Sequence, residues 1–240
     1  MIEVKTTGTP TRPVPESPPR SRSGLSRPQP DVIRVTSQIV VVGAGGHGRE
    51  LADIVQAISA ISPETELLGM ADDGEPDLGL IARSGLRFLG PTASLLDRNV
   101  EFALGVGEPK SRKRLDGITH GRAHAPLIHP TAQLGSQCRL TDGVVLAPRV
   151  VLTTNITIGR HTHVNVGSTI SHDVRIGDYV TICPGVTLTG GVEIGDRVFV
   201  GAGTTVLPGV AIGDHAVIGA GSLVVSDVEP GRTVKGSPAR

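Results

Sequence analysis

The chain is poor in aromatic residues and in cysteine. Aromatic residues make up 2% of the 240 residues, with one tyrosine, three phenylalanines and no tryptophan. This argues against a core built from large rings and for a narrow interior filled by stacked Ile, Val and Leu. Two cysteines, Cys138 and Cys183, are too few for a disulfide-stapled scaffold. We expect both to be small buried side chains.

The chain also lacks an excess of one charge and a long apolar run. It carries 23 basic and 23 acidic residues, so its formal net charge is zero. Nothing in the overall charge therefore indicates nucleic acid or a membrane surface as a partner. No apolar stretch has the length of a signal peptide or of a transmembrane helix. We expect a cytoplasmic protein with no nucleic-acid partner and no membrane insertion.

Residues 1–36 have a different composition from the rest of the chain. They are rich in Pro, Ser, Thr and Arg, which is typical of a segment that cannot bury a core. We predict a disordered tail. The alternative is a weak anion-binding arm, because the segment holds six basic residues against three acidic ones: Lys5, Arg12, Arg20, Arg22, Arg27 and Arg34.

Residues 37–123 are predicted to form a small Rossmann-like domain. Short aliphatic runs alternate with segments of helical spacing, and this alternation favours a parallel sheet with nucleotide-type sites at the strand ends. We expect strands at 38–42, 67–71, 87–89 and 100–106, a helix at 49–60 and the start of another at 110–115.

The turn between the first strand and the first helix is glycine-rich. Residues 43–48 read Gly-Ala-Gly-Gly-His-Gly and satisfy the G-x-G-x-x-G pattern. Glycines let a backbone approach a phosphate, and a helix N-terminus favours negative charge. Asp72 and Asp73 stand where a dinucleotide site places its ribose acid, but the same layout fits a nucleotide-sugar. The alternatives are a turn without a ligand and, for His47, either a phosphate donor or a surface residue.

An aliphatic residue returns at every sixth position of the second half of the chain. A period of six fits neither a helix nor an alternating strand, and it predicts a β-solenoid of short strands and turns over residues 124–240. The segment from Pro230 leaves this register. The repeating positions are Ile128, Leu134, Leu140, Leu146, Leu152, Ile158, Val164, Ile170, Ile176, Ile182, Leu188, Ile194, Val200, Val206, Ile212, Ile218 and Val224.

Three histidines of the repeat region are candidates for chemistry. His172 falls at a turn position and is followed by Asp173. An imidazole can accept a proton from an amine or a hydroxyl, and a carboxylate can hold its tautomer. Adjacent side chains rarely hydrogen-bond well, so we expect Asp173 to orient a neighbour other than His172. His161 and His163 are two residues apart and could bind a metal, but the sequence offers no third ligand set, and no metal is expected.

Taken together, these motifs make the chain resemble a family. The repeats resemble the left-handed parallel β-helix acyltransferases. The combination with the glycine turn resembles one branch of them, the bacterial sialic acid O-acetyltransferases and UDP-4-amino-sugar N-acetyltransferases. The resemblance covers residues 38–240 and is carried by residues 43–48, Asp72, Asp73, Gly105-Val106-Gly107, Arg112, Lys113, residues 170–173, residues 206–209 and residues 235–240.

The resemblance implies an acetyl-CoA-dependent sugar acetyltransferase that works as a homotrimer. It implies His172 as general base, with Asp173 as its acidic neighbour. It also implies acetyl-CoA contacts at Gly190, at Thr181 and at position 202. Some relatives carry a histidine at the position of Thr181. A glycine is expected at position 202, but this chain has Ala202. The nucleotide-sugar is expected at the glycine turn, near Gly45, His47, Asp72 and Asp73.

Other functions remain open at this point. A sialic acid O-acetyltransferase of the same fold would use the same base. A trimeric nucleotide-sugar-binding scaffold would use the repeats only as a spacer. A nicotinamide enzyme would explain the glycine turn, and a zinc hydratase would explain the clustered histidines.

Overall fold

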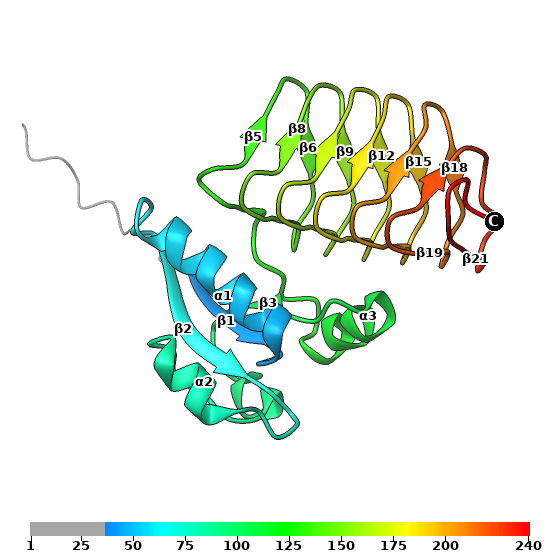
Figure 1. Ribbon diagram of the computed structural model, residues 1–240. Helices are drawn as coiled ribbons and strands as arrows, with labels where there is room; N and C mark the ends of the chain where they lie inside the picture. The colour runs from blue at the N-terminus through cyan, green and yellow to red at the C-terminus, as the bar shows by residue number, and fades with distance from the viewer. Residues whose placement is uncertain (1–36) are drawn as a thin grey trace, which may run out of the picture. The chain divides into compact units, whose positions relative to one another are not determined.

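The computed structural model describes residues 37–240, and the expected disordered or anion-binding tail at residues 1–36 lies outside them. The described residues form a three-stranded α/β domain followed by a stack of short strands (Figure 1). None of the helices in residues 37–240 is long and apolar enough to cross a membrane.

The α/β domain is a parallel sheet with helices. Its strand order is β2-β1-β3, so the carboxyl ends of all three strands meet at one edge. One predicted strand is wrong: of residues 87–89, only Phe88 forms a bridge, to Met70. Two helical segments were not predicted, α2 and a 3-10 turn at Thr92–Leu95. The elements are β1 (Ser37–Val42), α1 (Gly46–Ser59), β2 (Thr65–Ala71), α2 (Leu78–Arg83), β3 (Glu101–Leu104) and α3 (Pro109–Ile118).

Apolar side chains cover both faces of the small sheet. The buried stripe of α1, Leu51, Ile54 and Val55, belongs to the same core as Ile39 and Val41 of β1. On the other face, alternate residues of β1 and β3 form a second core with Leu95, Val100 and Leu115. The helical spacing and the strand alternation in the sequence therefore correspond to real packing faces.

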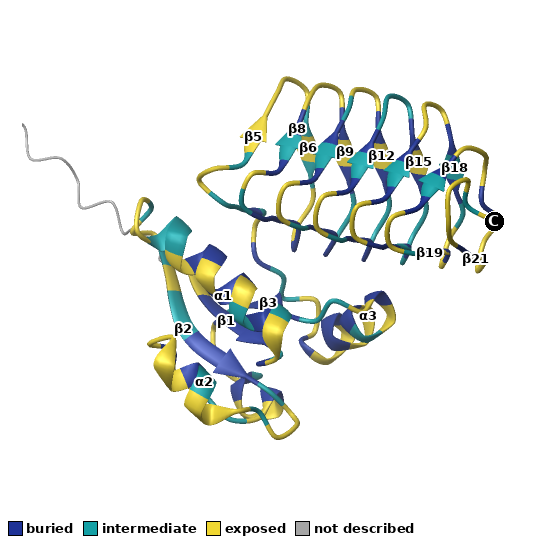
Figure 2. Ribbon diagram, in the orientation of Figure 1, coloured by how far each residue is buried: buried dark blue, intermediate teal, exposed yellow. Residues whose placement is uncertain are grey.

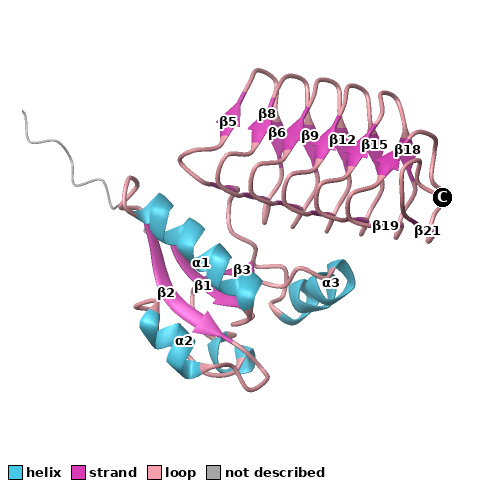
Figure 3. Cartoon of the chain, in the orientation of Figure 1, coloured by secondary structure: helices cyan, strands magenta, loops and turns pink. Residues whose placement is uncertain are grey.

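The second half of the chain is a regular β-solenoid. Every repeat contributes one two-residue strand, and turns connect the strands (Figure 3). The strands are β4 (Leu127–Ile128), β5 (Gln133–Leu134), β6 (Arg139–Leu140), β7 (Val145–Leu146), β8 (Val151–Leu152), β9 (Thr157–Ile158), β10 (His163–Val164), β11 (Thr169–Ile170), β12 (Arg175–Ile176), β13 (Thr181–Ile182), β14 (Thr187–Leu188), β15 (Glu193–Ile194), β16 (Phe199–Val200), β17 (Thr205–Val206), β18 (Ala211–Ile212), β19 (Val217–Ile218), β20 (Leu223–Val224) and β21 (Thr233–Val234).

One coil of the solenoid contains eighteen residues. His163 pairs with Thr181, and Val164 with Ile182, in parallel register. The second residue of each strand points inward, which explains the aliphatic period of six; the interior is buried and the turns are mostly exposed (Figure 2). β21 pairs with β19 through Val217 and Thr233. Their separation is sixteen residues rather than eighteen, so the predicted loss of register at the end of the chain is confirmed.

The three faces of the solenoid carry different outward side chains. We call the faces the docking face (β4, β7, β10, β13, β16, β19, β21), the uncharged face (β5, β8, β11, β14, β17, β20) and the charged face (β6, β9, β12, β15, β18). The outward residues of the charged face are Arg139, Thr157, Arg175, Glu193 and Ala211, and those of the uncharged face are Gln133, Val151, Thr169, Thr187, Thr205 and Leu223.

Helix α3 binds the docking face through two buried charged residues. Arg112 is fully buried, and its Nη2 donates to the carbonyls of Tyr179 and Val180 at 3.0 and 2.8 Å. Asp116 accepts hydrogen bonds from Arg160, from His161 at 3.0 Å and from the hydroxyl of Tyr179 at 2.7 Å. These contacts pair the buried carboxylate of Asp116 and Nη2 of Arg112, which is the condition for keeping charges inside a protein, while Nε of Arg112 has no partner within residues 37–240.

The donors around Asp116 make its stabilising contribution depend on pH. Burial opposes the charged form, but the hydrogen bonds from His161, Arg160 and Tyr179 prevail and lower the pKa of Asp116 well below its usual range. A carboxyl whose pKa falls on folding stabilises the fold above its unfolded pKa of about 3.9. This contribution is lost as the pH falls further toward the folded pKa.

We predict that Asp116→Ala lowers the free energy of unfolding by about 3 kcal/mol at pH 7, because it leaves buried donors without an acceptor. Urea unfolding measures the effect, and the difference from the unsubstituted protein should shrink at pH 3. Asp142→Ala is the control, since Asp142 is an exposed carboxylate whose side chain makes no hydrogen bond within residues 37–240. Equal effects of the two substitutions would contradict this role for Asp116.

Candidate active site

The glycine turn contains glycines of two kinds. The first kind is required by the fold. Gly43 has φ of +102°, and a Cβ on Gly48 would lie 1.8 Å from the carbonyl oxygen of Gly43. A Cβ on Gly105 would lie 2.6 Å from the Cα of Gly48. These three residues let the ends of β1 and β3 and the start of α1 come together, a role that any ligand-free turn could also need.

The second kind is not required by the fold. A Cβ on Gly45, Gly46 or Gly107 would meet no atom within 4 Å, and none of the three has a left-handed φ. The amides of Gly46, His47 and Gly48 donate no hydrogen bond within residues 37–240, and the first turn of α1 has no acidic residue. Open glycines before unpaired helix amides are suited to a close-lying anion.

Asp72 and Asp73 support the mouth of this turn. Asp72 accepts from the amides of Ala44 at 2.6 Å and Gly74 at 2.8 Å. Asp73 accepts from the amide of Thr92 at 2.8 Å. The two carboxylates therefore fix the loops around the glycine turn, and each keeps acceptor capacity for a further donor.

His47 is not a plain surface residue, because both of its ring nitrogens contact other side chains. Its Nε2 lies 2.9 Å from Nδ1 of His163, which belongs to β10 of the docking face. Its Nδ1 lies 3.5 Å from a carboxylate oxygen of Glu50. The glycine turn is thus connected directly to the solenoid.

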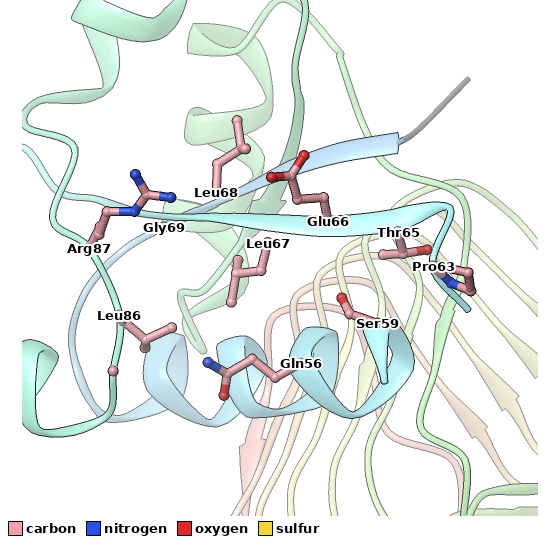
Figure 4. A pocket seen from close by; sticks show the side chains of 11 residues that line it. Gln56, Ser59, Pro63, Thr65, Glu66, Leu67, Leu68, Gly69, Leu86 and Arg87 are labelled. Atoms are coloured by element: carbon pink, nitrogen blue, oxygen red, sulfur yellow. The ribbon is translucent and has the colours of Figure 1, made fainter. Parts of the chain in front are cut away.

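Two hollows border helix α1. One, of about 220 Å³, is lined by His47, by apolar residues of α1 such as Leu51, and by solenoid residues such as Val166 and Pro184. The other, of about 560 Å³, is an open groove between the end of α1 and β2, lined by Gln56, Glu66 and Arg87 among others (Figure 4). Parallel α/β sheets bind ligands at the carboxyl ends of their strands. Of the two hollows, the smaller one includes His47 of the glycine turn, whereas the larger one lies at the start of β2.

His172 lies at a corner of the solenoid between the uncharged and charged faces. Its Nδ1 lies 2.8 Å from Oδ2 of Asp173, and Oδ1 of Asp173 accepts from Asn155 at 2.6 Å. The expectation that Asp173 would orient only another neighbour is therefore wrong. Asp173 has φ of +61°, a left-handed conformation that allows its carboxylate to reach the preceding ring.

This contact fixes the protonation pattern of His172. The hydrogen bonds from Asn155 and His172 lower the pKa of Asp173, so the carboxylate stays ionised and can only accept. The proton of the neutral imidazole then lies on Nδ1. Nε2 is left with a free lone pair, as a general base requires.

Gly190 lies one coil beyond His172, at the same corner. A Cβ on Gly190 would come within 2.5 Å of Cε1 and 2.7 Å of Nε2 of His172, so only glycine leaves room for the ring. The amide of Gly190 donates no hydrogen bond to any residue in 37–240. A free lone pair and a free backbone donor therefore lie side by side.

The other two predicted acetyl-CoA contacts lie away from this corner. Thr181 is buried on the docking face, where its hydroxyl donates to the carbonyl of Gly107 at 2.6 Å and accepts from Arg112. Ala202 is exposed at the corner between the docking and uncharged faces, one coil beyond Pro184. Within one chain, the structure brings together His172, Asp173 and Gly190 but not Thr181 and Ala202.

His161 and His163 bind different partners, Asp116 and His47. Residues 37–240 contain no group of three or more His, Cys, Asp or Glu side chains that could hold a metal ion. Sequence reasoning missed two contacts here, those of Asn155 and His163. The spacing of eighteen residues between Asn155 and Asp173 was a usable signal for the first.

Two family models match the chain. The bacterial transferase hexapeptide model of six repeats matches residues 155–190 and 191–226, and the PglD N-terminal domain model matches residues 38–116. A GDP-perosamine N-acetyltransferase from Escherichia coli O157:H7 is 33% identical over 137 residues. That alignment spans 55% of this chain and 61% of the relative.

Solved structures agree in fold over most of the chain. PerB from Caulobacter crescentus, in complex with CoA and GDP-perosamine, is 28% identical with a TM-score of 0.76, covering 85% of this chain and 96% of that one. The acetyltransferase domain of PglB from Neisseria gonorrhoeae, in complex with acetyl coenzyme A, is 26% identical with a TM-score of 0.75 and covers 85% and 98%.

The chain matches a PglD N-terminal domain and bacterial transferase hexapeptide repeats, and it is similar to sugar acetyltransferases built from the same two parts. The predicted fold class is confirmed: a small α/β domain is followed by a left-handed parallel β-helix. The glycine turn and the His172 corner lie on separate parts of this fold.

The two kinds of glycine lead to opposite expectations. Gly48→Ala should abolish folding or lower the free energy of unfolding by at least about 3 kcal/mol, because the new methyl group cannot avoid backbone atoms. Gly45→Ala should change it by less than about 1 kcal/mol. Thermal and urea unfolding measure both values. Strong destabilisation by Gly45→Ala would show that the fold itself requires that glycine.

Proposed function

We propose that the protein transfers an acetyl group from acetyl-CoA to an amino or hydroxyl group of a nucleotide-linked sugar, with His172 as general base. The observation that carries this proposal is the arrangement at the solenoid corner. Asp173 holds the Nδ1 proton of His172, Nε2 is free, and the unpaired amide of Gly190 lies beside it. This is the pairing of base and oxyanion donor that acyl transfer needs.

In the proposed reaction, Nε2 of His172 accepts a proton from the attacking group of the sugar. The nucleophile forms a bond to the thioester carbonyl carbon, and the carbonyl oxygen becomes an oxyanion. The amide of Gly190 donates to that oxygen, a contact commonly worth about 3 kcal/mol of barrier. As the carbon–sulfur bond breaks, protonated His172 returns its proton to the leaving sulfur. Asp173 stabilises the imidazolium between these steps.

The proposed acceptor is a nucleotide-sugar whose diphosphate lies at the glycine turn. Open glycines and three unpaired helix amides support an anion there. The hollow beside His47 has room for part of a sugar and is largely apolar. The similar protein from Escherichia coli O157:H7 is named a GDP-perosamine N-acetyltransferase, and PerB is bound to GDP-perosamine, which supports an amine as the acetylated group.

We infer that the active unit is a homotrimer. The α/β domain covers the docking face from β4 to β13, where the outward strand residues are buried, and the charged face presents Arg139, Arg175 and Glu193 to solvent. The uncharged face has no charged outward residue, and the exposed apolar side chains of Leu207 and Val225 flank it. If three uncharged faces pack around a threefold axis, the His172 corner of one copy lies next to the Ala202 corner of its neighbour.

The catalytic assignment predicts a selective loss of rate. His172→Ala should reduce kcat by about 10²–10⁴ while acetyl-CoA still binds, because only the proton acceptor is removed. Asp173→Asn should reduce kcat less and leave the protein folded. Acetyl-CoA consumption is measured with UDP- and GDP-linked amino sugars and with sialic acid. Unchanged kcat in a folded His172→Ala protein would refute the mechanism, and turnover of sialic acid alone would refute the nucleotide-sugar acceptor.

The assembly is tested by a matched pair of substitutions. Thr187 and Thr157 occupy equivalent outward strand positions, on the uncharged and the charged face. Thr187→Arg should dissociate the trimer and abolish activity, because it buries unpaired charge between copies. Thr157→Arg should leave both unchanged. Sedimentation velocity gives the oligomeric state, and a monomer of full activity would contradict the shared site.

A further inference from the structure

The bond between His47 and His163 joins two imidazoles across 116 residues of sequence. His163 is 1% exposed, and His47 is its sole hydrogen-bonding side-chain partner within residues 37–240. The position does not require histidine for the fold. The neighbouring coils carry Val145 and Thr181 at the same outward position, and both are buried.

Both imidazoles are neutral at pH 7. Burial, with the guanidinium of Arg112 close by, lowers the pKa of His47 and lowers the pKa of His163 well below the ordinary value. Each ring therefore carries one proton, and the bond between them admits two arrangements. Either His47 donates from Nε2, or His163 donates from Nδ1.

The surroundings favour donation from His163. If His47 donated, the proton of His163 would lie on Nε2, which is buried and has no acceptor, and a buried unpaired N–H costs about 1–3 kcal/mol. The bare Nδ1 of His47 would also face the carboxylate of Glu50. If His163 donates from Nδ1, its Nε2 carries no proton and is stabilised by the positive charge of Arg112. Nε of Arg112 is itself a buried donor without an acceptor. Nδ1–H of His47 then faces Glu50.

We propose that His163 is a positioning residue for the glycine turn: its Nδ1–H donates to Nε2 of His47 and so holds the proton of His47 on Nδ1. His47 thereby becomes a donor of fixed direction at the start of helix α1, beside the unpaired amides. Its acceptor is Glu50 in the free protein. An oxygen of the bound nucleotide-sugar replaces it in the complex, and this last step rests on the proposed function.

Three variants at one position separate this role from packing. His163→Val removes the donor and introduces the side chain that the fold already uses at Val145. His163→Asn restores an N–H near the place of Nδ1. Val217→Ala, at an exposed outward position of the same face, is the control.

The first measurement needs no substrate. Imidazole ¹⁵N chemical shifts should report the Nδ1–H tautomer for His47 in the unsubstituted protein and in His163→Asn. In His163→Val the same signals should move toward a mixture of tautomers. An Nε2–H tautomer of His47 in the unsubstituted protein, or an unchanged spectrum in His163→Val, would overturn the proposal.

The second measurement is the affinity for UDP and for GDP by calorimetry. His163→Val should weaken whichever nucleotide binds by about tenfold, the weight of one charge-assisted hydrogen bond. His163→Asn should recover most of the loss, and Val217→Ala should lose no affinity.

In a His47→Ala background, His163→Val should have no further effect on affinity, since His163 acts through that ring. Additive losses of affinity would overturn the proposal. Failure of both nucleotides to bind the unsubstituted protein would count against the proposed acceptor, while the tautomer measurement would still decide the role of His163.

Discussion

Every site in this protein depends on the hydrogen bonds that stack one coil on the next. Parallel strands lie about 4.8 Å apart in the stacking direction, so residues eighteen apart become neighbours. Gly190 lies against His172 for this reason, and Asn155 can reach Asp173. A chain of two-residue strands thus achieves precise placement without a thick core, which accounts for its near absence of aromatic residues.

The solenoid also provides the platform on which the α/β domain is held. Arg112 and Asp116 of α3 and His47 at the start of α1 meet successive coils of one face. Buried charges and imidazoles need specific partners, whereas an apolar contact could slide. The carboxyl ends of β1 and β3, with their glycine turns, are therefore fixed relative to the coils that precede and follow His172.

The periodic part of this structure was predictable from the sequence, and the aperiodic part was not. Seventeen aliphatic positions at a spacing of six gave the solenoid, because burial on one side of each strand leaves a pattern. The bond between His47 and His163 leaves no pattern in the sequence, since it depends on how the surfaces of the α/β domain and the solenoid meet. The contact of Asp173 with His172 was missed although a signal existed: Asp173 stands in the six-residue register of Asn155, Gly167 and Gly185, all of which have a left-handed backbone. The roles of Thr181 and Ala202 toward acetyl-CoA stay predictions.

The eighteen-residue coil also restricts how such a protein can change length. Loss of one hexapeptide would turn every later face by a third of a revolution and bring charged side chains onto the uncharged face, and gain of one would bring them onto the docking face. A whole coil could be added beyond Gly209 without disturbing the His172 corner or the docking contacts, all of which lie earlier in the chain. The same coil inserted between Asn155 and Asp173 would separate Asp173, which supports the base His172, from its own partner Asn155. Length variation is therefore expected as whole coils near the end of the solenoid.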